Sequence, residues 1–218
     1  MTNQTNVMER VRKALGRAGP LAQPPVPPKI DEHIARLVFS DLGLAELFAN
    51  RARDMKMLVE PVSIEDLLPR MAAFLKEKNC ASAMLSDTPL LQKLKAAEYL
   101  NDHGIIARNW RDMTADATYD VDAGVTEADY AVAETGTLVI RHGVANGRLL
   151  SLVPFVHLAV IEPKIIVPDL IDLFERLGAD GTGSGVTLIS GPSKTADIEM
   201  NTVTGVHGPN VVMAFVLS

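Results

Sequence analysis

The densest group of reactive side chains lies mid-chain, in the ETGT segment at residues 134–137. Short apolar runs at 131–133 and 138–140 flank it, and such runs are typical of buried strands. The glycine permits a tight turn between the two strands. This turn would gather two hydroxyls, a carboxylate and backbone N–H groups, and clustered N–H groups bind anions. The stretch predicts either an anion-binding turn or a plain corner between strands.

Two further polar segments follow near the end of the chain. ISGPSKTADIE at 189–199 combines hydroxyls, a glycine, a lysine and two carboxylates after an apolar run at 186–189. Groups of this kind meet polar ligands at the carboxyl end of an open sheet. The segment lacks the GxxxxGK[ST] pattern, so it does not support nucleoside triphosphate binding. GVHGP at 205–209 predicts a tight turn that presents the imidazole of His207.

Other candidates are a histidine and a pair of arginines. His157 lies in an apolar strand predicted at 155–161, where a histidine is more often structural than catalytic, but it could face the same pocket as Glu134. Arg141 and Arg148 bracket a loop with two glycines. Arginine offers paired donors to carboxylate or phosphate, so this loop either closes over an anion or is simply solvated.

The elements that position these residues alternate between strand and helix. Strands are predicted at 57–62, 81–86, 105–107 and 211–217, with helices at 63–78 and 90–100. This rhythm indicates an α/β fold, a mostly parallel sheet covered by helices on both faces. The acidic stretch at 109–126 is predicted to be a solvated loop.

The first 30 residues have a different character. Helical spacing at 6–16 is followed by five prolines within residues 20–28, a composition typical of a stiff linker. We predict an N-terminal helical arm and proline-rich linker at 1–30 and a single α/β domain at 31–218.

Composition excludes several classes of protein. The 218 residues are 47% hydrophobic and carry a net charge of −6, which argues against a nucleic-acid partner. The most apolar segment, 149–161, is too short to span a membrane, and no secretory signal is visible, so we expect a cytoplasmic protein. The lone Cys80 predicts a packing residue and cannot by itself hold a conventional iron–sulfur cluster.

Three motifs in order, AETGTLV, ISGPSKTADIE and GVHGP, resemble the LUD domain, specifically the lactate-utilisation protein C family. VHLAV around His157 and the N-terminal arm are similar too, so the likeness spans almost the whole chain. The resemblance implies a fold similar to the sugar-phosphate isomerase and CoA-transferase superfamily. It also implies a role in oxidising L-lactate to pyruvate, with no cofactor in this chain and an iron–sulfur cluster on a partner protein.

We expect a small anionic ligand at the motifs. Glu134 or His207 would act as acid–base groups, while hydroxyls, backbone N–H groups and Arg148 would hold a carboxylate. The positions that match the family are Glu134, Thr135, Gly136, Thr137, His157, Ser190, Gly191, Ser193, Thr195, Asp197, Glu199, His207 and Gly208. Two alternatives remain: a stand-alone acyl or CoA transferase or isomerase that uses Glu134, and a non-catalytic scaffold whose arm docks electron-transfer proteins.

Overall fold

The computed structural model describes the backbone of residues 3–17, 31, 43–196, 202–204 and 208–218, and the side chains of 7–17, 31, 43–194 and 208–218. The chain divides into two units, Met1–Ala35 and Arg36–Ser218. In the first, helix α1 (Asn3–Ala14) exposes an apolar stripe at helical spacing. The stripe consists of Val7, Met8, Val11 and Leu15.

The second unit is built on a six-stranded sheet in which every pair of neighbours is parallel. Its order is β1-β12-β7-β4-β2-β3. The strands are β1 (Leu58–Val62), β2 (Ser82–Leu85), β3 (Ile106–Asn109), β4 (Ala123–Glu127), β7 (Val156–Ile161) and β12 (Val211–Leu217). Because all run the same way, their amino ends share one edge of the sheet and their carboxyl ends the other.

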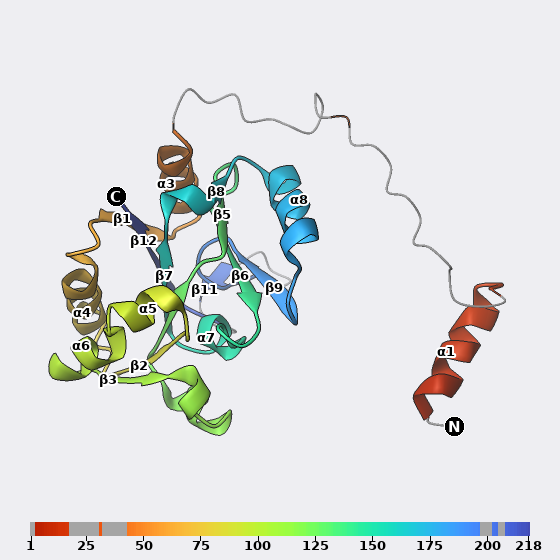
Figure 1. Ribbon diagram of the computed structural model, residues 1–218, viewed down its shortest axis with the longest axis horizontal. Coiled ribbons are helices and arrows are strands. Elements are labelled where there is room, and N and C mark those ends of the chain that lie inside the picture. Colours follow the sequence, from red (N-terminus) through yellow and green to blue (C-terminus); the bar gives the residue numbers. More distant parts are fainter. Residues whose placement is uncertain (1–2, 18–30, 32–42, 197–201, 205–207) are drawn as a thin grey trace. The chain divides into compact units, whose positions relative to one another are not determined.

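Three helices cover one face of this sheet. They are α4 (Leu67–Glu77), α5 (Pro89–Lys93) and α6 (Ala96–Asp102) (Figure 1). One core cluster joins them to the sheet through residues such as Leu75, Leu100, Leu158 and Phe215. Alternate residues of the same strands point to the opposite face.

Helices also lie on the other face, as predicted, because Leu47 and Phe48 of helix α3 (Leu44–Asp54) pack there and helix α7 (Leu149–Leu152) contacts β4 at Gly124. This face also carries a second, four-stranded sheet, which was not predicted. Its order is β8-β5-β6-β9, with β8 (Ile166–Val167), β5 (Tyr130–Val132), β6 (Thr137–His142) and β9 (Gly185–Ile189). Ala159 and Ala214 of the parallel sheet pack with Leu138 and Ile140 of the second sheet in one core. Helix α8 (Leu170–Asp180) packs on its far side through Leu173 and Leu177.

The second sheet arises because both faces of the β5–β6 hairpin are apolar. Tyr130, Val132 and Val139 pack toward α8, while Ala131 and Leu138 pack toward the parallel sheet. The hairpin thus forms a layer between the parallel sheet and a helix. Strands of the second sheet and strands of the parallel sheet show the same local pattern of apolar residues, so this pattern does not tell which sheet a strand joins.

The stretch at 109–126, predicted to be a solvated loop, contains two short 3-10 helices, η1 (Trp110–Asp112) and η2 (Asp116–Asp120), and most of β4. Asp122 is structural, since its Oδ2 accepts hydrogen bonds from the N–H groups of Ala81 and Ser82, each at 2.9 Å. β4 packs under the short helix α7 (Leu149–Leu152) at Gly124. A Cβ there would lie 1.8 Å from the Leu150 carbonyl oxygen.

The other predicted elements form with shifted ends. The helix expected at 90–100 is divided into α5 and α6 at Lys95, whose φ is +52°. Helix α3 (Leu44–Asp54) leads into β1. The remaining short elements are η3 (Pro163–Ile165) and an unforeseen hairpin of β10 (Lys194–Ala196) and β11 (Thr202–Thr204). Within the described part of the chain, no helix is long and apolar enough to cross a membrane.

Candidate functional site

A line of three hydroxyl groups joins the first two motifs. Thr135 Oγ1 lies 2.7 Å from Thr137 Oγ1, which lies 2.7 Å from Ser190 Oγ. The central Thr137 is only 3% exposed, whereas Thr135 is half-buried and Ser190 is exposed, so both ends of the line are more accessible than its middle. The three hydroxyls carry three protons and the two contacts between them use two, so one proton remains for donation to a ligand.

Two glycines bring these motifs against the end of helix α3. Gly136 has φ +61°, and a Cβ there would lie 2.2 Å from the backbone nitrogen of Ala52. Gly191 has φ +88°, and its Cβ would lie 2.1 Å from the carbonyl oxygen of Met55. Both positions combine a left-handed backbone with close backbone contact, which only glycine tolerates without strain. The end of α3 therefore holds both turns in place.

The third motif meets the second at Ser193. The Ser193 N–H donates to the Pro209 carbonyl at 2.9 Å, and a Cβ on Gly208 would lie 3.2 Å from the Ser193 Cβ. Pro209 precedes β12 just as α3 precedes β1. The three motifs thus meet beside the amino edge of the parallel sheet, and the expected position at its carboxyl end is wrong.

Charged groups of both signs lie in these turns. Glu134 is half-buried and is held by its backbone N–H, which donates to the Pro168 carbonyl at 3.0 Å. Lys194 is exposed, and its Nζ donates to the Met55 carbonyl at 3.4 Å. That carbonyl also contacts Gly191, so the ammonium lies close to the second motif. Lys194 was predicted only as part of its motif and not as a site residue, although it stands between the candidates Ser193 and Thr195.

Several candidates cannot be placed. The side chain of Thr195 lies outside the described residues, as do Asp197, Glu199 and His207 entirely. Their roles stay predictions.

His157 is fully buried within the fold. Its Nε2 lies 2.9 Å from the hydroxyl of Thr126, and its Nδ1 has no partner among the described residues. Burial lowers the pKa of His157 to about 4, so the ring is neutral near pH 7. With no exposed surface, it is placed as a structural residue between strands β4 and β7.

Arg148 lies at the other end of the β6–β9 pair. Its Nη2 donates to the Ser184 carbonyl at 2.6 Å, just before β9. The register pairs His142 with Gly185 at this end and Leu138 with Ile189 at the other. The five residue steps from Thr137 to His142 span about 17 Å of strand. The structure therefore does not bring Arg148 to the hydroxyl line.

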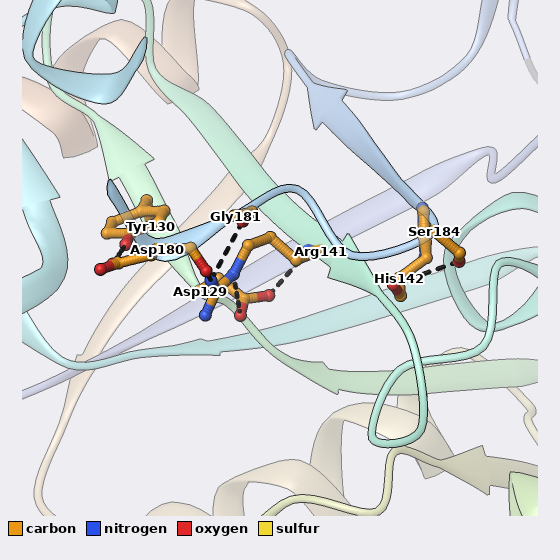
Figure 2. A network of polar contacts seen from close by, with 7 residues as sticks. All are labelled: Asp129, Tyr130, Arg141, His142, Asp180, Gly181 and Ser184. Carbon is orange, nitrogen blue, oxygen red and sulfur yellow. Dashed lines mark hydrogen bonds and ion pairs between the residues drawn. The ribbon is translucent and has the colours of Figure 1, made fainter. Parts of the chain in front are cut away.

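The neighbouring polar side chains brace the second sheet (Figure 2). Arg141 Nε lies 2.9 Å from Asp129 Oδ1, and its Nη1 donates to the Asp180 carbonyl at 3.3 Å. The Tyr130 hydroxyl donates to the Asp180 carboxylate, and together these contacts tie the β5–β6 hairpin to the end of α8. The expected anion-closing loop is thus largely engaged in structural contacts.

The chain is an α/β protein in which a six-stranded parallel sheet stacks on a smaller mixed sheet. Its polar site lies where helix α3 meets the second sheet. The fold is similar to the crystal structure of a DUF162 family protein from Deinococcus radiodurans, with a TM-score of 0.63 and 23% sequence identity over 83% of this chain and 100% of that one. The LUD domain family matches residues 46–217.

Curated relatives are similar across the whole chain. Lactate utilization protein C of an Exiguobacterium species is 33% identical over 100% of this chain and 96% of its own length. Lactate utilization protein C 1 of Bacillus mycoides is 31% identical over 79% of each chain. The chain belongs to the lactate utilization protein C family of LUD-domain proteins, as its motifs predicted.

Proposed function

We propose that this chain is a subunit that supports the oxidation of L-lactate to pyruvate and binds a small anionic ligand at the hydroxyl line. The observation that carries the proposal is the meeting of the three motifs at one place. Thr137 contacts Ser190, and Ser193 contacts Gly208 and Pro209. Family membership supports the role in lactate utilisation.

The ligand would be held by neutral donors and one cation. The free proton of the hydroxyl line and the Lys194 ammonium suit a carboxylate, because a charged partner strengthens each hydrogen bond. Lys194 replaces Arg148 in this role, since Arg148 lies at the far end of the strands. The carboxylate of Glu134 would face the other end of the ligand, because it repels a negative charge.

Oxidation of lactate removes a proton from the hydroxyl and a hydride equivalent, one hydrogen with two electrons, from the carbon that bears it. Glu134 or His207 would take the hydroxyl proton as general base. The C–H hydrogen leaves with both electrons as a hydride equivalent, and we place its acceptor on a partner protein of the lactate-utilisation system, which passes the electrons to an iron–sulfur cluster. We also infer a relationship to the sugar-phosphate isomerase and CoA-transferase fold, which the parallel sheet supports.

Replacement of the central hydroxyl tests the proposal. Thr137→Val keeps the shape of a buried side chain but removes the link between Thr135 and Ser190. A hydrogen bond to a charged ligand is worth about 1.5–3 kcal/mol, so lactate-dependent oxidation should fall tenfold or more in cells that lack the native protein. Glu134→Gln and His207→Ala should reduce it as well.

Thr182→Val is the matched control, because Thr182 is exposed in the loop before β9. Thermal melting of each purified variant separates loss of folding from loss of function. Native rates of oxidation in folded Thr137→Val and Glu134→Gln would refute a ligand site here. Turnover of acyl-CoA or sugar phosphates by the isolated chain would instead support a stand-alone enzyme.

A further inference from the structure

A polar cavity lies at the carboxyl edge of the parallel sheet, opposite the edge that carries the hydroxyl line. Its volume is about 320 Å³. Strands β2, β4 and β7 end at this edge, where ligands of open α/β sheets commonly bind. The polar lining residues are Thr88, Glu127, Asp129, Asn146, Glu162 and Lys164. None of them belongs to the three motifs.

Three of the lining residues carry buried oxygens without a hydrogen-bond partner among the described residues. They are Thr88 Oγ1, Glu127 Oε2 and Asn146 Oδ1. Thr88 is 6% exposed and Asn146 is 4% exposed, so bulk water does not satisfy them freely. Buried polar atoms in native proteins almost always have a partner. Three unmet oxygens around one cavity indicate a bound group that donates hydrogen bonds.

The charged groups around the cavity also favour a ligand that donates hydrogen bonds. Asp129 is paired with Arg141 at 2.9 Å, and Glu162 is paired with Lys164. Glu127 makes no ion pair with any residue that the structure describes. Desolvation raises the pKa of the Glu127 carboxyl, and the charges of Glu162 and Asp129 raise it further. The nearby Thr88 side chain and Leu90 N–H offset part of the rise, but neither makes a hydrogen bond to Glu127 Oε2. A positive charge in the cavity would relieve this repulsion.

We propose that this cavity binds the protonated amine of a small organic molecule. A primary ammonium has three N–H donors, which matches the acceptor oxygens of Glu127, Asn146 and Thr88. A metal ion fits less well, because no group of three His, Cys, Asp or Glu side chains in the described ranges is arranged to hold one. The site is independent of the proposed lactate function, since it lies at the other edge of the sheet.

The test uses the full chain and two probes of similar size, n-butylamine and 1-butanol. Binding is measured by calorimetry, and the amine should bind while the alcohol, which lacks the charge, should bind at least tenfold more weakly. Glu127→Gln should weaken amine binding tenfold or more. The Glu127→Gln variant should still fold, because it removes a negative charge from a position where burial and neighbouring carboxylates disfavour that charge. Glu175→Gln is the control, because Glu175 is exposed on α8.

Thr88→Val provides a second variant, and it should weaken amine binding severalfold. Equal binding of amine and alcohol would overturn the proposal, as would native amine affinity in both site variants. Competition by KCl or MgCl₂ beyond the effect of matched ionic strength would assign the cavity to an inorganic cation instead and would equally overturn the assignment to an amine.

Discussion

His157 shows how burial gives a histidine a structural role. The side chain has no exposed surface, and its pKa is lowered to about 4 by burial, compared with an ordinary value of about 6.5. The folded state therefore binds fewer protons than the unfolded state between pH 4 and 6.5. Stability is intact above pH 6.5 and falls as the pH drops through this window.

Replacement of His157 should remove this pH dependence. The difference of 2.5 pKa units corresponds to about 3 kcal/mol, so the wild type should lose about that much more unfolding free energy than His157→Gln when the pH falls from 7 to 4. Urea unfolding at several pH values measures it. His103→Gln, at a ring that stacks on Tyr99 at the end of α6, is the comparison. Parallel pH curves for the wild type and His157→Gln would contradict the prediction.

Residue type alone could not tell which of the candidate residues belong to the site and which do not. The glycine and hydroxyl positions were found because they form compact motifs. Arg148 was included because an arginine in a glycine-containing loop suits an anion, but the β6–β9 register carries it to the other end of the pair. Glu127, the last residue of β4, was not a candidate because the stretch before it was predicted to be a loop. Its unmet oxygen depends on packing that no local sequence pattern records.

At the scale of elements, the turn at Gly136 is the place where helix α3 contacts the second sheet. In Gly136→Ala, a Cβ would enter the backbone of Ala52 while φ stays positive. We expect a loss of about 2–4 kcal/mol, the sum of left-handed strain and displacement of the helix. Urea unfolding of the purified variant measures the change.

Substitutions at two other glycines separate the cost of left-handed strain from the cost of displacing the helix. Gly104→Ala has φ +80° with open space around the new Cβ, so it should cost only about 1 kcal/mol. Gly178→Ala lies within helix α8, also in open space, and should be neutral or slightly stabilising. If Gly136→Ala costs no more than Gly104→Ala, the contact with α3 does not hold the turn.

Most elements could be predicted from the sequence, because apolar runs and capping residues are local signals. The exceptions have tertiary causes. β4 contains Gly124, which weakens a strand signal but is needed where Leu150 approaches. The second sheet was missed because its strands resemble those of the parallel sheet. Stacking of two sheets depends on which faces meet, and that information is spread over the whole chain.

At the scale of the whole molecule, the two units differ in how their apolar residues are used. All described core clusters lie in the Arg36–Ser218 unit. In the first unit, α1 exposes Val7, Met8, Val11 and Leu15 and carries Arg12 and Lys13 in its last turn. An amphipathic helix with an uncovered apolar face is a common docking element.

We therefore expect α1 to bind the proposed iron–sulfur partner. A chain that lacks residues 1–28 should keep the melting temperature of the larger unit, because no described core residue is removed, yet lose co-purification with the partner. Val11→Ser should weaken the association in the intact chain, since it interrupts the stripe. Phe174→Ser is the matched control, because Phe174 is 60% exposed on α8. Undiminished association of the shortened chain would place the docking surface on the α/β unit, where the hydroxyl line itself would then be the first region to examine.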